Sequence, residues 1–440
     1  MKNKMKTLLA TTLITGMGLV QPSLANVDTT VERSFNPYKF EQPDVGKLTP
    51  GVVVNAANVD TLARQFLDDG MFKMVKDGWV ELTIGKTTPI PLSMNYQNAT
   101  NNNYKNVTLG EKIGQINGYV SGRPFPQEPD LNDPRAGEKL AWNFRYGLFF
   151  GDSGKIAPFY WKYRDMESGK VERTMKMEFR GYNWMHRTIE APLGNVENNP
   201  SGVFRSIYMR VDEPYDVKNT QLLIHRYEDD LKRDNAWLYL GFQRRVRRLA
   251  SGQITDSFLG SDLMIEDFEG YNGRISDMKW TYKGVKWVLL PIYNHNEQSL
   301  GEEFASDDGY KFVTFGGKGG CFPNTSWQVR KTYEIEAVPV DSNHPVGKRE
   351  MYMDSETGAL LRINVHDRSE KLWKMWFITQ NHFDSHLDRH KGIGVPVFDG
   401  FGMMDVQAMH CTTAQMRSEI HPGTFDTKSF TPQYLRATGR

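Results

Sequence analysis

The stretch "REMYMDSETGALLRINVHD" at residues 349–367 decides the class of fold, because it carries a complete β-hairpin pattern. Apolar residues alternate with other residues on both sides of a turn-forming segment, Asp354–Gly358. They are Met351 and Met353 before the turn, and Leu361, Ile363 and Val365 after it. A period of two around a turn predicts two strands with one buried face, which is typical of an antiparallel sheet.

Two further segments repeat this alternation. In "RTMKMEFRG" (173–181), Met175, Met177 and Phe179 alternate with charged residues. In "MKWTYKGVKWVLL" (278–290), the pattern predicts a hairpin that turns at Lys283-Gly284. Because these units follow one another along the chain, we expect a meander rather than βαβ units. The predicted fold is mainly β with some helix (α+β), and the sheet must curl and have its apolar face covered.

The first third of the chain has a different character. Residues 58–78 have helical periodicity and predict a helix pair or one broken helix. Residues 26–50 lack periodicity and predict an extended arm, and the asparagine-rich residues 96–106 predict a loop. The proline-rich residues 122–137 predict an extended segment, either a domain linker or an arm packed onto the body.

The N-terminus has the pattern of a secretory signal peptide. Three lysines precede an apolar run from Leu8 to Val20, and a small-x-small cleavage site follows at Ser23-Leu24-Ala25. We expect residues 1–25 to be removed and the mature chain to be exported to the periplasm without a transmembrane segment. Loss of the three lysines from 54 basic residues leaves 51 against 53 acidic ones. This balance argues against nucleic acid as a partner.

The stretch "WLYLGFQRRVRRL" (237–249) joins an apolar strand to a block of positive charge. Both alternating faces of residues 237–242 are apolar, which predicts a central strand covered on both sides. Arginines cannot be buried without partners, so the strand must leave the core near Phe242. The block contains Arg244, Arg245, Arg247 and Arg248. Either these arginines pair with Asp262, Glu266, Asp267 and Glu269, or they form an electropositive rim beside an apolar groove.

Cys321 and Cys411 are the two cysteines of the chain. In an oxidising compartment they can form a disulfide bond. As free thiols they would behave as small buried hydrophobic residues. The sequence leaves both states open.

Three histidines in "NHFDSHLDRHKG" (381–392) are the strongest candidates for chemistry. His382, His386 and His390 recur every four residues and would line one face of a helix. Two histidines at this spacing can share zinc, but the third lies a turn too far and the metalloprotease glutamate is missing. We therefore expect hydrogen-bonded or solvated histidines, with no metal and no cofactor. The GxSxG and Walker patterns are also absent, so no enzyme is predicted.

The stretch "WLYLGFQRRVRRLASGQITDSFLGSDLMIEDF" (237–268) resembles a signature of bacterial proteins related to the LolA/LolB-like periplasmic lipoprotein carriers. Within that superfamily the chain resembles the exported family called domain of unknown function 1329. The stretches "LTPGVVVNAANVD" (48–60), "DPRAGEKLAWN" (133–143) and "HDRSEKLWKMW" (366–376) agree with it. The resemblance covers most of the mature chain.

This resemblance implies a strongly curved antiparallel sheet that forms an unclosed half-barrel, with helices at its mouth. It divides the chain into a signal peptide (1–25), an N-terminal arm and helical segment packed on the body (26–136), and the sheet domain (137–440). It also implies two partners, an inner-membrane exporter of the resistance-nodulation-division class and an outer-membrane β-barrel protein.

Three functions follow as hypotheses. The first is a carrier for a hydrophobic or lipid-like molecule, the second a non-carrying adaptor between those two partners, and the third a metal-dependent hydrolase. For a carrier, the expected cavity residues are Trp237, Tyr239, Leu240, Phe242, Trp280 and Trp287. The expected rim is the arginine block.

Overall fold

A computed structural model describes residues 28–197, 199, 202–250, 254–295, 309–421, 423 and 425–439. The predicted signal peptide lies outside the described residues. Among the helices that are described, none combines the length and the apolar character needed to cross a membrane.

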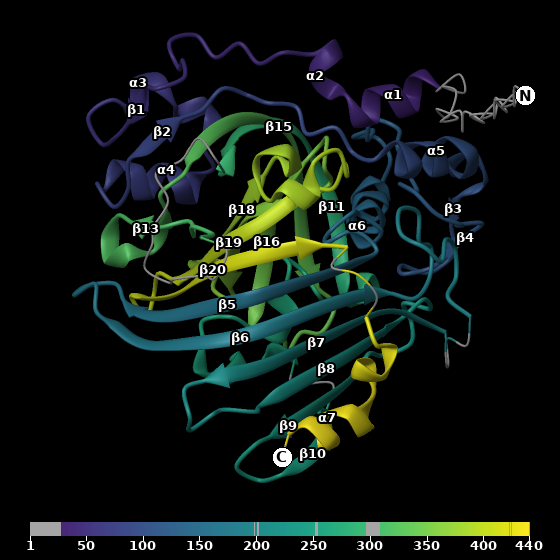
Figure 1. Cartoon of the computed structure of the whole chain (residues 1–440). Coiled ribbons are helices and arrows are strands. Elements are labelled where there is room, and N and C mark those ends of the chain that lie inside the picture. The colour runs from purple at the N-terminus through teal and green to yellow at the C-terminus, as the bar shows by residue number, and fades with distance from the viewer. Residues whose placement is uncertain are drawn as a thin grey trace, which may run out of the picture.

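A single large curved sheet of sixteen strands forms the body (Figure 1). Its first wing is a meander of β5 (Ser153–Asp165), β6 (Val171–Asn183), β7 (Val203–Glu213), β8 (Gln221–Tyr227), β9 (Asn235–Leu240) and β10 (Arg245–Arg248). Its second wing is a meander of β15 (Ser326–Pro339), β16 (Val346–Asp354), β17 (Leu360–Asp367), β18 (Leu372–Asn381), β19 (Val397–Asp405) and β20 (His410–Ile420). The antiparallel pairing of β20 with β5 joins the two wings.

The remaining strands pair with β15 or β18 of the second wing or lie apart from the large sheet. β11 (Met278–Leu290) pairs with β15, as does β2 (Leu82–Ile84), which carries β1 (Val53–Val54). β12 (Ile292–Tyr293) pairs with β18. Two small ribbons are formed by β3 (Thr108–Leu109) with β4 (Ile116–Asn117), and by β13 (Phe315–Gly316) with β14 (Phe322–Pro323). The large sheet does not close into a barrel.

The hairpin predicted at residues 349–367 is confirmed. β16 and β17 flank the turn, and Met351 lies opposite Ile363. The strand predicted at residues 173–181 is confirmed as part of β6. The unclosed curved antiparallel sheet is therefore the one that the alternation and the family resemblance predicted.

The long connection between the wings crosses one face of the sheet. The chain leaves β10 at one edge and re-enters the sheet at β11, beside the opposite end. Residues 254–277, here called the strap, therefore have to span the sheet. Short 3-10 turns of the strap include Phe258–Gly260, Ile265–Asp267 and Ile275–Asp277. The face that the strap covers is called the inner face.

Helix α6 (Ala136–Arg145) covers the inner face together with the strap. Gly137 lets this helix approach β11 closely, because a Cβ atom there would lie 2.7 Å from the Trp280 carbonyl carbon. Leu140, Trp142 and Phe144 of α6 belong to the same apolar core as the inner-face residues of the strands.

Other helices cover the outer face or the ends of the sheet. α3 (Val59–Leu62) and α4 (Asp69–Lys76) confirm the broken helix, and they pack with Leu289 and Met375 in a second core. α7 (Pro432–Thr438) packs over β8 and β9 in a third core. α1 (Thr29–Phe35), α2 (Pro37–Phe40) and α5 (Met94–Asn103) complete the N-terminal part (Figure 1).

Three local predictions were wrong. Residues 278–290 form one strand rather than a hairpin, because β15 offers a partner along its whole length and Gly284, at φ +128°, sits at a bulge next to Tyr282. Residues 94–103 form α5 rather than a loop, because Tyr96, Gln97 and Thr100 are buried and tertiary packing overrides the low helix propensity of asparagine. The supposed extended arm begins with the helices α1 and α2.

Cys321 and Cys411 are joined by a disulfide bond. Both residues are fully buried in the core beneath α3 and α4. The bond ties the segment before β14 to the second residue of β20.

Candidate ligand-binding site

An apolar cavity lies between the strap and the inner face. Its floor comes from neighbouring strands of the two wings, β18, β19, β20, β5, β6 and β7. Strand residues in its lining are Ile156, Phe159, Trp161, Phe179, Met209, Trp376, Ile378, Phe401 and Met416. Alternation within the strands places these side chains on one face. Leu263, Phe268 and Glu269 of the strap form its roof.

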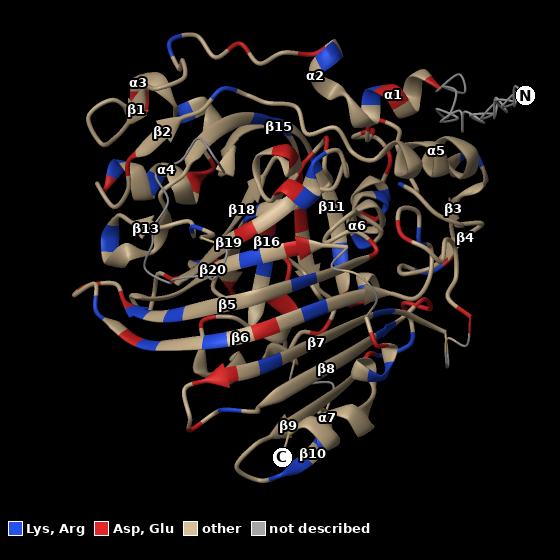
Figure 2. Ribbon diagram, viewed as in Figure 1, with Lys and Arg blue, Asp and Glu red and all other residues tan. Residues whose placement is uncertain are grey.

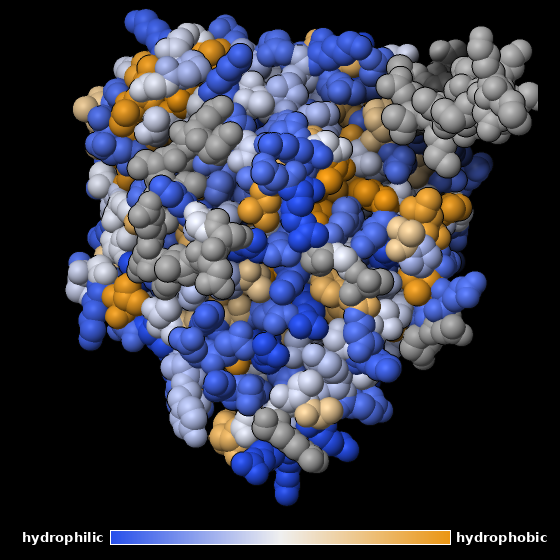
Figure 3. Space-filling model, in the orientation of Figure 1, coloured by the Kyte–Doolittle hydropathy of each residue, from blue (hydrophilic) through white to orange (hydrophobic). Residues whose placement is uncertain are grey.

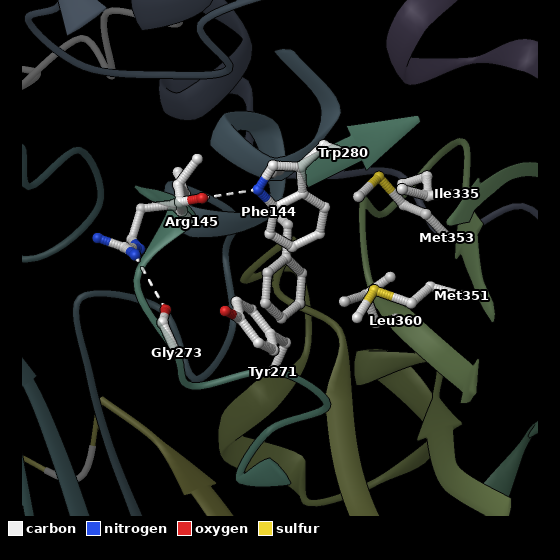
Figure 4. A pocket seen from close by; sticks show the side chains of 11 residues that line it. Phe144, Arg145, Tyr271, Gly273, Trp280, Ile335, Met351, Met353 and Leu360 are labelled. Atoms are coloured by element: carbon white, nitrogen blue, oxygen red, sulfur yellow. Dashed lines mark hydrogen bonds between the residues drawn. The ribbon is translucent and has the colours of Figure 1, made fainter. Parts of the chain in front are cut away.

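Two further small cavities continue along the inner face. One lies where α6, the strap and β7–β8 meet and shares Glu269 with the first cavity. The other lies between α6, the strap and β11, and it is lined by Trp280, Met351 and Met353 (Figure 4). Figure 4 shows the Phe144 and Tyr271 rings side by side between Arg145 and the two methionines. Phe144 and Tyr271 line both of these cavities, so the three lie in a row.

The three cavities are nearly filled by the protein itself. Their volumes are about 40, 30 and 10 Å³. An apolar cavity of roughly 150 Å³ holds a benzene molecule. An aliphatic chain therefore enters the inner face only when the strap or α6 moves. A larger hollow of about 590 Å³ lies between α6 and residues 107–136, but its lining includes Asp130, Asp133 and Lys139.

Buried charges hold the middle of the strap. Arg349 of β16 donates from Nη2 to Asp267 at 2.7 Å and to Glu266 at 3.2 Å, and all three side chains are at most 3% exposed. Burial alone would raise the pKa of Glu266, but Arg349 and His344 outweigh it and lower this pKa. Burial would lower the pKa of Arg349, and the two carboxylates instead raise it. These ion pairs thus attach the strap to β16. Removing one partner is costly, because it leaves the other charge buried without compensation.

Polar anchors also hold both ends of the strap. At the near end, Asp262 binds His410 Nδ1 at 2.8 Å and accepts a hydrogen bond from Thr412. This contact with Asp262 raises the pKa of His410. At the far end, Asp230 accepts hydrogen bonds from the backbone N–H groups of Ile275 and Ser276.

Comparison with known proteins places most of the chain in one family. The family model described as "Protein of unknown function (DUF1329)" matches residues 53–436. The chain belongs to the DUF1329 family.

Individual relatives are distant from this DUF1329 chain. An uncharacterized protein of Pseudomonas aeruginosa is 23% identical over 389 residues, covering 83% of this chain and 75% of the relative. A crystal structure of a DUF1329 family protein from Desulfovibrio piger aligns with 69% of this chain and 100% of its own, with 17% identity and a TM-score of 0.46. A LolA superfamily protein from Nitrosomonas europaea aligns with 68% of this chain and 98% of its own, with 11% identity and a TM-score of 0.39.

The residues predicted to line the cavity divide between the two faces of this DUF1329 protein. Trp280 lines an inner cavity, and its indole N–H donates to the Ile275 carbonyl at 2.8 Å. The prediction for Trp287 was wrong, because this residue packs with Tyr38 in the outer core. A hairpin would have placed Trp280 and Trp287 side by side. A single strand separates them by roughly 23 Å at about 3.3 Å per residue.

The strand at residues 237–242 is next to the edge of the sheet rather than central. β9 pairs with β8 on one side and with the edge strand β10 on the other. Trp237 and Tyr239 were wrongly assigned to the cavity, because α7 covers their face and the Tyr239 hydroxyl donates to the Gly439 carbonyl. Phe242 was also wrongly assigned, since it is 73% exposed in the turn. Leu240 is partly buried and lines none of the three inner cavities.

The arginine block lies on the β9–β10 hairpin, at the lower end of the molecule (Figure 2). All four arginines are exposed, and the surface at this end is mostly hydrophilic (Figure 3). Within the part of the chain that the structure describes, none of them forms an ion pair, and Arg248 donates to the Asn235 side chain. The expected pairing with acidic residues was wrong. Asp262, Glu266, Asp267 and Glu269 bind His410, Arg349 and Arg205 instead.

We expect the arginine block to contribute little to stability. Replacing Arg244, Arg245, Arg247 and Arg248 together by glutamine should leave the melting temperature nearly unchanged, because these side chains are exposed and have no charged partner among the described residues. Thermal unfolding followed by circular dichroism measures the effect. A fall of several degrees would mean that the arginines take part in a network that holds the sheet edge.

The histidine row does not form the predicted helix. Residues 383–385 and 388–390 are separate 3-10 turns, and the stacked rings of His386 and His390 share an Nδ1···Nδ1 contact of 3.1 Å. Burial lowers the pKa of His386 well below its usual value, and it lowers the pKa of His390 to about 4. Both rings are therefore neutral at pH 7, because protonation would place charge in a buried site.

The hydrogen bonds fix the proton positions in this neutral pair. His390 Nε2 accepts from the Ile420 N–H, so its Nδ1 carries the proton and donates to His386. His386 must then donate from Nε2 to the Tyr310 hydroxyl, at 2.8 Å. His295 and Asp399 are remote from His386 in the chain, so no local sequence pattern marks them. In the structure, ligand atoms of these three residues lie within 4.8 Å of one another.

We expect this group to remain metal-free. A metal would have to displace His390 or Tyr310 from His386, and also donors from Asp399, which binds Thr379, His295 and Asn381. After incubation with zinc and gel filtration, elemental analysis should find well below one equivalent per chain. One equivalent of zinc in the parent that is lost in the His386→Ala variant would contradict this and revive the hydrolase hypothesis.

Proposed function

We propose that this protein is a carrier for a hydrophobic or amphiphilic, lipid-like molecule, bound between the inner face and a displaced strap. The strap supports the proposal most directly. It covers a continuous row of apolar side chains, yet buried ion pairs and hydrogen bonds fix it at several points. A segment held in this way can exchange between docked and released positions without unfolding the sheet beneath it.

The lining of the largest inner cavity offers further support. Trp161 and Trp376 are 1% and 2% exposed, and their indole N–H groups have no acceptor among the described residues. A buried donor without a partner costs about 1–3 kcal/mol. An ester or carboxyl oxygen on a bound molecule would supply an acceptor. Hydrophobic residues form only separate patches on the face drawn in Figure 3, which agrees with an apolar site that is closed in this state.

The proposed setting is the periplasm, between an inner-membrane exporter and an outer-membrane β-barrel protein. The N-terminal sequence pattern and the family resemblance support this setting. The exposed arginines of the β9–β10 hairpin are suited to an acidic surface on such a partner, and binding of that kind weakens as salt increases. A non-carrying adaptor is the alternative function, and it would use the hairpin without using the cavity.

Mass spectrometry of bound lipid tests the carrier function. Protein purified from periplasmic extract without detergent should release a stoichiometric lipid-like molecule on solvent extraction. A Met209→Trp variant should release much less, because the larger side chain fills the cavity. The control is Val285→Trp, at a partly exposed position of β11 outside the cavity lining. Absence of bound lipid from the parent, together with retained partner binding, would favour the adaptor.

A further inference from the structure

Two consecutive strap residues occupy the largest inner cavity in different ways. Phe268 is 5% exposed, and its ring meets the Trp161 ring edge-on, with centroids 6.2 Å apart. Glu269 also lines the cavity, and its carboxylate accepts a hydrogen bond from Arg205 Nη2 at 2.6 Å. Together they place an apolar group and an anionic group side by side on the inner face.

The backbone at this point adopts a conformation that side chains disfavour. Glu269 has φ +59°, in the left-handed region, and Gly270 follows with φ +103°. A non-glycine residue is strained in this region and persists there only where the surroundings enforce the conformation. A Cβ atom at Gly270 would lie 3.1 Å from Leu360 Cβ, so the chain is pressed against β17. The Arg205 ion pair, the Phe268 ring contacts and the hydrogen bond from the Gly270 N–H to the Asp267 carbonyl at 3.1 Å all act to hold Glu269 in this conformation.

Arg205 is incompletely satisfied even with Glu269 in place. Its side chain is 12% exposed, and its buried Nε has no hydrogen-bond partner among the described residues. The two other arginines that line the adjoining cavity have carboxylates of their own, Asp230 for Arg145 and Asp234 for Arg226. When the strap withdraws around Glu269, Arg205 is therefore the arginine of the cavity lining that loses its carboxylate, at the end of the apolar cavity.

We propose that Phe268 and Glu269 occupy the place of the cargo, and that the cargo is an aliphatic chain bearing an anionic oxygen group. When cargo enters, its chain takes the place of Phe268 and its carboxylate or phosphate takes the place of Glu269 on Arg205. A guanidinium can form two parallel bonds to such a group, which would also engage the free Nε. This inference rests on the proposed carrier function and specifies the chemical class of cargo.

Binding of four matched probes tests the inference. The probes are palmitate, hexadecyl phosphate, hexadecanol and hexadecyltrimethylammonium, each measured by isothermal titration below its micelle concentration. We expect the parent to bind the two anions more tightly than the alcohol. Glu269→Gln should tighten anion binding, because it removes the internal competitor for Arg205. The two anions distinguish a fatty-acid headgroup from a phosphate headgroup.

Variants of Arg205 supply the decisive comparison. Arg205→Gln should weaken anion binding by roughly 10- to 100-fold, the effect of a charge-assisted hydrogen bond, and leave hexadecanol binding nearly unchanged. Because that variant leaves Glu269 buried and unpaired, the double variant R205Q/E269Q is measured as well, and it should bind palmitate and hexadecanol alike. Arg368→Gln, an exposed position in the β17–β18 turn, is the control for charge loss.

Two outcomes would overturn the inference in distinguishable ways. Equal loss of palmitate and hexadecanol binding in R205Q/E269Q would mean that Arg205 is only structural, while the carrier function would stand. Binding of none of the probes by the parent or by Glu269→Gln would overturn the carrier function, and this inference with it.

Discussion

Replacing Cys321 and Cys411 with alanine is expected to lower the free energy of unfolding by about 4–5 kcal/mol, because their bond closes a loop spanning 90 residues in the chain. The bond removes conformations from the unfolded chain, and this entropy grows with the logarithm of loop length. Urea denaturation of the oxidised parent and of the double variant measures the difference. The parent in excess reductant is the control and should match the variant.

Thiol labelling gives an independent check of this bond. The oxidised parent, unfolded in denaturant, should show no reactive thiol. Two reactive thiols per chain, or equal stability of the oxidised and reduced parent, would contradict the pairing. In that case Cys321 and Cys411 would act only as small apolar residues in the core beneath α3 and α4.

Arg349→Met is expected to produce the second large effect. It removes the arginine that pairs with Glu266 and Asp267, which are both 2% exposed. Asp267 then lacks its ionic partner, and Glu266 keeps only His344. Loss of one partner from a buried ion pair typically costs 3–5 kcal/mol. We expect a destabilisation of about this size, with faster hydrogen exchange of the strap than of β5 and β6. Urea denaturation and hydrogen exchange followed by mass spectrometry are the measurements.

A triple variant separates the loss of charge balance from the loss of packing. Arg349→Met combined with Glu266→Gln and Asp267→Asn leaves no unpaired charge at this position. It should recover most of the stability that the single variant loses, since a neutral set of similar volume is often tolerated. If the single and triple variants are equally unstable, the ion pairs do not set the energy of the strap.

The class of fold could be predicted because alternation is a local property. Met351 and Ile363 mark one buried face on both arms of a hairpin, and the structure pairs them directly. The error at β11 has a similar origin, since Lys283-Gly284 suits a hairpin turn and a bulge equally well. What distinguishes a hairpin turn from a bulge here is the length of the partner strand β15, which begins at Ser326, about 43 residues after Lys283.

The residues of the candidate site were harder to predict from the sequence than the class of fold. Trp161, Trp376 and Phe401 come from strands of two separate meanders, and only the β20–β5 pairing brings these strands together. The acidic residues near the arginine block were noticed, but their true partners, Arg205, Arg349 and His410, are distant in the chain. Local signals for the cavity did exist, because the alternation of Phe159 and Trp161 in β5 marks an apolar face.

The pairing of β5 with β20 also has a consequence for how the chain folds. The two wings meet at a seam between nearly the first and the last long strand of the body. No part of that seam can form until residues 410–420 have been synthesised. Contacts between such remote segments slow folding, because the entropy of closing a long loop is lost before the contacts form. A chain that ends before β20 leaves β5 and β19 as unpaired edges, and unpaired edges favour aggregation.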